Sequence, residues 1–256
     1  LAEAFLRIPD EETANLLIRD KIGGAAWEDH LGGSDSLLVN ASTWALMLGG
    51  RVMRWHEASG SQPWQIVQKA VARAGEPVIR RAVTQAMRIM SRQFVMGRDI
   101  GEALDRARES AARGARHSFD MLGEAARTAA DAEKYFAAYL SAIEAVGGAA
   151  GASTSVFAAD SISVKLSALH PRFEYAKGAR LQQELAPRLG ALAAAAKKHG
   201  IGLTIDAEEA DRLEPTLDMF AAVYESPELA GWRGFGLVVQ AYQKRAPAVI
   251  DWLADL

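Results

Sequence analysis

From residue 116 onward, short β-type runs alternate with long alanine-rich segments, and this rhythm constrains the fold more than any other feature. The four runs cover 117–122, 161–166, 201–206 and 236–240. Helices are predicted over 131–146, 179–198 and 208–224, with a last one starting near 247. Alternation of buried-type strands with helices favours parallel pairing in βα units. The sequence therefore predicts an α/β fold built on a parallel sheet.

Two architectures share this rhythm, the doubly wound sheet and the (β/α)8 barrel, and the residues that follow each run help to distinguish them. The runs finish in polar or charged groups, namely Asp120 with Glu124, Lys165 with Ser167, Asp206 with Glu208, and Gln240 with Tyr242. Polar groups that converge from the carboxyl ends of successive strands build the site of a barrel. A dinucleotide-binding sheet would place a glycine-rich turn after its first strand, whereas the glycine-rich stretch 147–151 precedes a strand. We therefore expect a (β/α)8 TIM-type barrel.

The four βα units are too few to close such a barrel. An open half-barrel would leave a strand edge and much of the core exposed. We therefore assign residues 116–256 to the first half of the barrel and expect further strands downstream of Leu256. Residues 1–115 are predicted to form an all-α arm and a helical domain, because helical segments there are joined by turns marked by glycine or proline.

One helix of the first region, beginning near residue 77, has a basic side. Its polar stripe consists of Arg81, Gln85, Arg88 and Arg92. This side is either an anion-binding or nucleic-acid-binding face, or an arginine face that is solvated or paired with acids elsewhere. The net charge of −3 and the isoelectric point near 6.0 give no overall attraction to nucleic acid. We expect no nucleic-acid partner.

Composition excludes several classes of chemistry. The chain has no cysteine, which removes disulfides, thiolate nucleophiles and iron–sulfur clusters. Its five histidines form no His-x-x-x-His pair, so no metal site is expected. No segment approaches the ~20 apolar residues that a membrane-spanning helix needs. A cytoplasmic location is expected, with a peripheral position at the inner membrane left open.

Lys165 is the most informative single residue, because it ends a β-type run among apolar neighbours. In a barrel mouth this lysine could bind a carboxylate or a phosphate, or form a Schiff base if burial lowered its pKa. The structural alternative is an ion pair with Asp206 or Asp120. Asp206 ends its own run and is expected to point into the mouth, whereas Glu209 and Asp211 are predicted to cap the next helix.

Four segments, in chain order, resemble the strand ends of proline dehydrogenases. They are SFDMLGEA over 118–125, SVKLSALHPR over 163–172, DAEEADRLE over 206–214 and the stretch 236–245 that contains QAYQKR. The helical lead-in is similar to the arm and α-domain that precede the barrel in proline utilization A, the bacterial bifunctional branch of the family. The resemblance covers essentially the whole chain.

This resemblance implies a distorted (β/α)8 barrel that holds FAD without a covalent bond. The implied reaction is oxidation of L-proline to Δ1-pyrroline-5-carboxylate, with hydride transfer to flavin N5. By resemblance, Lys165 helps to bind the proline carboxylate, Asp206 lines the substrate cleft and the flavin site, and Gln240 hydrogen-bonds the isoalloxazine ring. Glu124 matches an acid that pairs with a substrate-binding arginine and gates the site, and Asp120 supports the first strand end.

The resemblance also implies partners beyond this segment. The arginine pair expected to grip the substrate carboxylate has no match here, so residues 1–256 alone are expected neither to hold FAD tightly nor to turn over proline. Bifunctional relatives continue into an NAD-dependent aldehyde dehydrogenase domain that oxidises glutamate semialdehyde to glutamate. A homo-oligomer is expected, and contact with a membrane quinone is left open. The alternatives are an aldolase-like barrel with a Schiff-base lysine, or a helical module that binds nucleic acid or a protein partner.

Overall fold

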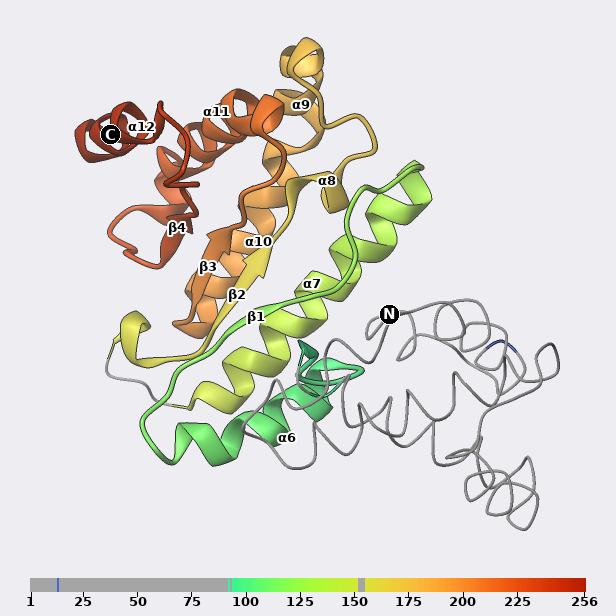
Figure 1. The fold of residues 1–256 in the computed structure, drawn as a ribbon, viewed down its shortest axis with the longest axis vertical. Coiled ribbons are helices and arrows are strands. Elements are labelled where there is room, and N and C mark those ends of the chain that lie inside the picture. The colour runs from blue at the N-terminus through green and yellow to red at the C-terminus, as the bar shows by residue number, and fades with distance from the viewer. Residues whose placement is uncertain (1–12, 14–91, 93, 152–154) are drawn as a thin grey trace, which may run out of the picture. The chain divides into compact units, whose positions relative to one another are not determined.

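The computed structural model describes residues 13, 92, 94–151 and 155–256 (Figure 1). The chain divides into two compact units, Leu1–Ala103 and Leu104–Leu256. The helices expected ahead of residue 91, and most of the arginine stripe, lie outside the described residues. The predicted domain boundary after residue 115 stays a prediction.

The second unit alternates strands with helices, as the sequence predicts. Its strands are β1 (Ser118–Asp120), β2 (Ser161–Val164), β3 (Gly202–Ile205) and β4 (Phe235–Leu237). The α-helices are α6 (Ile100–Ala111, which begins in the first unit), α7 (Ala129–Ala150), α8 (Leu166–Leu169), α9 (Gly178–Glu184), α10 (Ala186–His199), α11 (Leu213–Tyr224) and α12 (Ala246–Asp255). Short 3-10 turns cover Val156–Ala158, Tyr175–Lys177, Ala210–Arg212 and Pro227–Leu229.

The four strands form one sheet in the order β1-β2-β3-β4, and every neighbouring pair is parallel. Each strand is followed by at least one helix before the next strand begins, so all the crossovers are βα units. The predicted parallel sheet is confirmed. Within the described part of the chain, β1 and β4 are the two outer strands of an open sheet.

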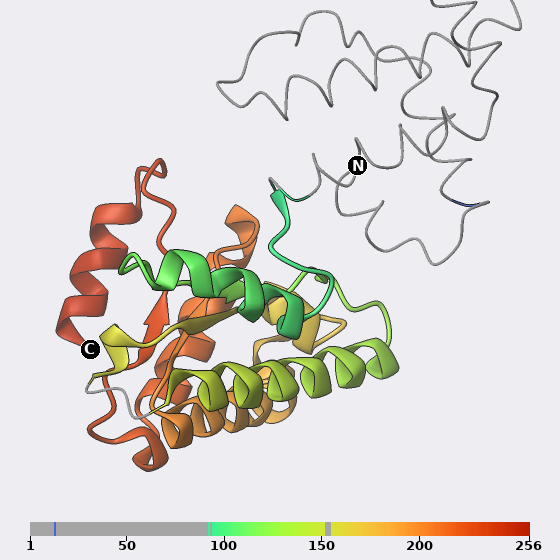
Figure 2. The ribbon, with the colours of Figure 1, turned by 90° about the horizontal axis from the view of Figure 1, so that it is seen from below.

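The two faces of the sheet differ in character. Phe119, Ile162, Val164, Leu203 and Ile205 are buried at alternate positions along their strands. Helices α7 and α10 pack together against this face (Figures 1 and 2). The intervening positions hold mostly small or polar residues, namely Ser118, Asp120, Ser161, Ser163, Gly202 and Thr204. The strands therefore have one buried apolar face and one polar face. Lys165 and Asp206, which directly follow β2 and β3, continue the polar face.

Local signals explain where the two main helices begin and end. Thr128 caps α7: its hydroxyl accepts from Asp131 N–H at 3.1 Å, and the Asp131 carboxylate accepts from Thr128 N–H at 2.9 Å. This reciprocal pair satisfies donors that the first turn of a helix leaves open. Helix α10 ends at Gly200, which adopts the left-handed conformation at φ 68°.

Several predicted bounds need correction. The helix expected over 179–198 is two helices, because Pro187 lacks an N–H and fits only the first turn of a new helix. The helix expected from residue 208 begins at Leu213, after an extended loop and a 3-10 turn. The expected cap by Glu209 is wrong: its side chain makes no capping bond and pairs with Arg212 at 3.2 Å. Strand β4 ends at Leu237, so Gln240 lies in the following loop.

Candidate active site

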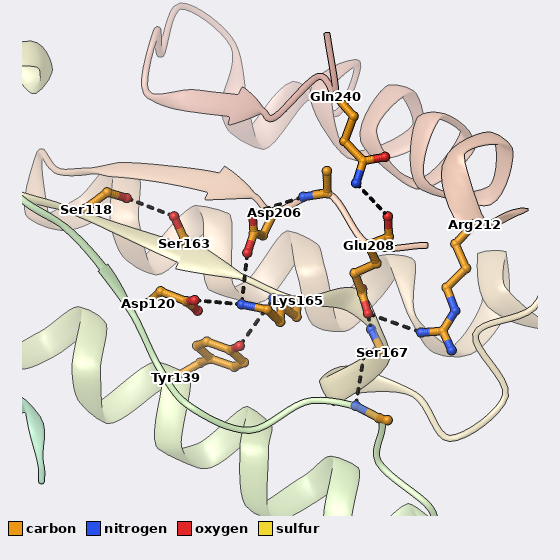
Figure 3. A network of polar contacts seen from close by, with 12 residues as sticks. Ser118, Asp120, Tyr139, Ser163, Lys165, Ser167, Asp206, Glu208, Arg212 and Gln240 are labelled. Carbon is orange, nitrogen blue, oxygen red and sulfur yellow. Dashed lines mark hydrogen bonds and ion pairs between the residues drawn. The ribbon is translucent and has the colours of Figure 1, made fainter. Parts of the chain in front are cut away.

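The Lys165 ammonium lies between two carboxylates at the carboxyl ends of the strands (Figure 3). Its Nζ is 2.7 Å from Asp120 Oδ2 and 2.9 Å from Asp206 Oδ2. The three residues follow or end β2, β1 and β3, so parallel pairing brings them to one edge of the sheet. The sequence analysis left open an ion pair with either acid, and the structure contains both.

The surroundings keep this lysine protonated. Burial alone lowers the pKa of Lys165, whose side chain is 15% exposed, but the hydrogen bonds that its ammonium donates to Asp120 and Asp206 outweigh burial and raise the pKa well above its ordinary value. A Schiff base needs a neutral amine, so the pair of carboxylates works against that alternative. An ammonium has three N–H donors, and the two recorded carboxylate contacts leave one for a ligand.

Tyr139 forms a hydrogen bond with the main chain of Lys165. It lies on α7, is 1% exposed, and its hydroxyl oxygen accepts a hydrogen bond from Lys165 N–H at 3.2 Å. The register pairs Asp120 with Ser163, so Lys165 lies beyond the last residue paired with β1. The phenol therefore supplies an acceptor where the neighbouring strand has ended. Burial of the hydroxyl raises the pKa of Tyr139 to about 12, so the group remains a neutral phenol.

A second cluster, formed by Ser167, Glu208 and Arg212, lies beside the lysine. Ser167 N–H donates to Glu208 Oε1 at 2.9 Å, and Arg212 donates to the other carboxylate oxygen at 3.1 Å. The Glu208 side chain is only 7% exposed, so its charge needs both partners. These bonds fasten the loop after β3 to α8, the helix that follows β2 (Figure 3).

Gln240 joins this cluster from the loop after β4. Its Nε2 donates to the Glu208 main-chain carbonyl at 3.0 Å, and its Oε1 accepts from Gln243 Nε2 at 2.5 Å. A pocket lies beside it, lined by twelve residues that include apolar Val238 and Val239. Lys165 does not line this pocket, so the polar cluster and the pocket are neighbouring parts of one strand-end region that Gln240 and Glu208 connect.

Glu124 lies in the loop after β1 and is exposed, outside the hydrogen-bonded group around Lys165. The backbone of this loop is unusual, with Gly123 at φ 141° and Ala125 at φ 53°. Ala125 N–H donates to Ser167 Oγ at 3.0 Å, and Ala126 N–H donates to the Ser167 carbonyl at 2.9 Å. The structure therefore places Glu124 on a loop that is anchored to Ser167.

The structure brings together Lys165, Asp206 and Asp120, and connects Gln240 to them through Glu208. The sequence analysis named Ser167 and Glu208 among the polar groups at the strand ends but assigned neither a role. Ser167 lies on α8, so its bond to Glu208 comes from the fold and not from the alternation of an extended strand. No local signal could have found Tyr139, an aromatic residue on an apolar helix whose partner is 26 positions away.

Among the described residues, no group of three or more metal-ligating side chains gathers. Among the same residues, no helix has the length and apolar character needed to cross a membrane.

Parallel βα units with charged and amide groups converging at the strand ends define a barrel-type α/β protein whose site opens at the carboxyl end of its sheet. Residues 103–256 match the family model described as proline dehydrogenase, and residues 1–94 match one described as the DNA-binding domain of proline dehydrogenase. The first match covers more than half of the chain. The chain belongs to the proline dehydrogenase family, and its fold is of the TIM-barrel type.

Known relatives support this assignment over the full chain. The bifunctional protein PutA of Salmonella typhimurium is 51% identical over 257 residues, and that of Rhizobium meliloti is 49% identical over 256. The chain spans 19% and 20% of the lengths of these relatives. A crystal structure of Bradyrhizobium japonicum PutA matches with a TM-score of 0.61 at 46% identity, covering 98% of this chain and 25% of that one. PutA from Bdellovibrio bacteriovorus, at 18% identity and a TM-score of 0.63, shares the fold.

Proposed function

We propose that this chain supplies the first half of a proline dehydrogenase barrel that oxidises L-proline to Δ1-pyrroline-5-carboxylate. The observation that carries the proposal is the Lys165 ammonium, held between Asp120 and Asp206 at the strand ends of a member of this family. A protonated lysine with one remaining N–H suits a substrate carboxylate. Asp206, which lies on the other side of the ammonium from Asp120, would line the substrate cleft.

Charge balance bears on how the substrate is held. Two carboxylates already face Lys165, so this cluster carries one negative charge more than it has positive charges. A substrate carboxylate would add another, and its binding needs further cations. The arginine pair expected from the resemblance, which has no match within 1–256, would supply them. The proposed binding site therefore combines Lys165 with groups outside this chain segment.

The flavin cofactor FAD fits the residues beside this cluster. The residues around Gln240 include apolar Val238 and Val239 and a second amide, Gln243, and a flavin likewise has an apolar ring with a polar edge. By resemblance, Gln240 and Asp206 would contact the flavin; Gln240 lines the pocket, whereas Asp206 lies outside its lining, in the Lys165 cluster. Each Gln240 amide atom keeps hydrogen-bonding capacity beyond its contact with Glu208 or Gln243. When bound, FAD supplies the two-electron acceptor that takes the substrate hydride at N5.

A flavin spectrum tests the proposal. The full-length protein should be yellow, with flavin absorbance that is bleached when L-proline is added under anaerobic conditions and returns with an electron acceptor. D-proline provides the matched control for substrate recognition. A colourless protein, or a flavin that L-proline leaves oxidised, would contradict the proposal. A covalent adduct at Lys165, trapped with borohydride and a carbonyl substrate, would instead support the aldolase-like alternative.

Further proposals concern the rest of the protein. The relatives that match over the whole of this chain are named bifunctional. By that likeness, a downstream NAD-dependent aldehyde dehydrogenase domain would oxidise glutamate semialdehyde to glutamate. The expected homo-oligomer, cytoplasmic location and peripheral contact with a membrane or quinone stay predictions. Formation of glutamate and NADH from L-proline by the full-length protein would establish the second activity.

A second candidate function comes from the amino-terminal match, whose model is named for DNA binding. Arg81, Arg88 and Arg92 belong to this region, whereas the net charge of the chain is −3. The description of the matching family model therefore favours DNA binding, whereas the sequence-based expectation is that the chain has no nucleic-acid partner. Fluorescence anisotropy of duplex DNA with the full-length protein, at 50 and 200 mM salt, decides between them. Binding that weakens steeply with salt would favour the DNA-binding candidate.

A further inference from the structure

Ser167 connects two strand-end loops, those after β1 and β3, to α8, the helix that follows β2. Its hydroxyl accepts from Ala125 N–H in the loop after β1, and its N–H donates to Glu208 in the loop after β3. Ser167 itself lies on α8, two residues after Lys165, and is 3% exposed. All three polar groups of this serine are used, since its carbonyl also accepts from Ala126 N–H at 2.9 Å. Figure 3 shows this arrangement beside the Lys165 cluster.

The loop after β1 needs this support because its backbone is strained. Ala125 has φ 53°, in the left-handed region where the Cβ of a residue other than glycine crowds the backbone. Gly123, two residues earlier, also has positive φ, and a Cβ there would lie 2.4 Å from a ring carbon of Tyr135. Such a conformation persists where surrounding contacts enforce it. The two hydrogen bonds to Ser167 are the recorded contacts that fix the strained residue.

We infer that Ser167 is a positioning residue that fixes the loop after β1, and with it Glu124, relative to the strand ends that carry Lys165 and Asp206. This inference rests on the proposed function and on the role that the resemblance implies for Glu124, as an acid that pairs with a substrate-binding arginine and gates the site. Glu124 immediately precedes Ala125, so the bond from Ala125 N–H to Ser167 Oγ sets the position of the carboxylate. Without that bond the loop would relax away from its strained conformation, and Glu124 would lose its place.

Ser167→Ala in the full-length holoenzyme removes the hydroxyl alone. Hydrogen exchange at the Ala125 amide should become about 5-fold faster, equivalent to loss of one hydrogen bond of about 1 kcal/mol. The Ala126 amide, which bonds the main-chain carbonyl of Ser167, keeps its partner and should change less. Ser163→Ala is the matched control, since it removes a hydroxyl from the same segment whose recorded partner is Ser118 Oγ. Unchanged exchange at Ala125 would overturn the inference.

Kinetics separate positioning from general stability. Ser167→Ala should raise the KM for L-proline several-fold while flavin content stays at the wild-type level. If the serine acts through Glu124, the double variant Ser167→Ala, Glu124→Gln should have the KM of Glu124→Gln alone. Effects that multiply would overturn the inference. Should Ser167→Ala fail to fold, Ser167→Cys keeps the shape with a weaker acceptor and takes its place in every measurement.

The two proposals fail in different ways. If the wild-type protein shows no flavin bleaching with L-proline, the proposed function is wrong, and faster exchange at Ala125 in Ser167→Ala would still establish that this serine holds the loop. If wild-type bleaching occurs and Ser167→Ala matches the wild type in exchange and KM, the inference is wrong and the function stands.

Discussion

Lys165 acts as the electrostatic centre of the strand-end region, and its replacement should affect substrate more than cofactor. In the full-length protein, we expect Lys165→Met to raise the KM for L-proline about 10-fold or more, because a hydrogen bond to a charged group contributes about 1.5–3 kcal/mol. Flavin content should stay near normal. Lys134→Met, at an exposed position on α7, is the matched control. Loss of flavin at unchanged KM would mean that this lysine binds the cofactor instead.

The raised pKa of Lys165 predicts low reactivity toward acylating reagents. A group whose pKa is higher in the folded state than in the unfolded state stabilises the fold fully at pH values below its ordinary pKa. This stabilisation is lost as the pH rises through the raised pKa. The ion pairs with Asp120 and Asp206 should therefore persist throughout pH 7–10. Trace acetylation at pH 9, followed by mass spectrometry, should modify Lys165 far less than exposed Lys134. Asp206→Asn removes one of the two negative charges that raise the pKa of Lys165, and it should increase Lys165 labelling. Equal labelling of the wild type and Asp206→Asn would contradict this assignment.

At the scale of elements, close contact between α7 and α10 depends on a single glycine. A Cβ added at Gly147 would lie 2.4 Å from the Cβ of His199, whereas a Cβ at Gly148 would meet nothing within 4 Å. Gly147→Ala should therefore lower the free energy of unfolding by about 1–3 kcal/mol, because the two helices must move apart. Gly148→Ala should raise it by up to about 1 kcal/mol through helix propensity. Urea unfolding of both variants measures the difference, and equal shifts would rule out this packing argument.

Elements with strong local signals could be predicted from the sequence, and those set by tertiary partners could not. The four strands and the helix after each were predictable from apolar runs and alanine-rich segments. Pro187 signalled the break at Leu185, but the helical pattern continues across it, and the prediction followed the pattern. Helix α8 was missed because Lys165, Ser167 and Ser163 resemble a continuing strand. Its four residues form a single turn held by contacts with other loops.

The same division applies to the site. Lys165, Asp206 and Asp120 were predictable because parallel strands must bring their carboxyl ends to one edge. The hydrogen bonds of Ser167 and Tyr139 join positions 42 and 26 residues apart, and no periodicity in one sequence encodes such pairs.

At the scale of the whole molecule, the open sheet predicts what residues 1–256 can do alone. The polar side of the sheet is only partly covered within the described residues: the side chains of Asp120 and Asp206 are 41% and 29% exposed. Four parallel strands form half of a (β/α)8 barrel, and closure requires eight. The Lys165 cluster also carries one excess negative charge, which opposes a substrate carboxylate until further cations are present.

We therefore expect residues 1–256, expressed alone, to lose FAD on desalting and to show no L-proline-dependent dye reduction. The longer protein, extended to the length of its relatives, should retain the flavin and reduce the dye. Isothermal titration of FAD into both forms gives the affinities, and the longer form serves as the positive control. The reason is that half a barrel presents only one wall of the proposed cofactor site. Tight, stoichiometric FAD binding by residues 1–256 would contradict this expectation. It would show that the strand-end groups of β1–β4 suffice for the cofactor, and that the other half of the barrel is needed only for substrate.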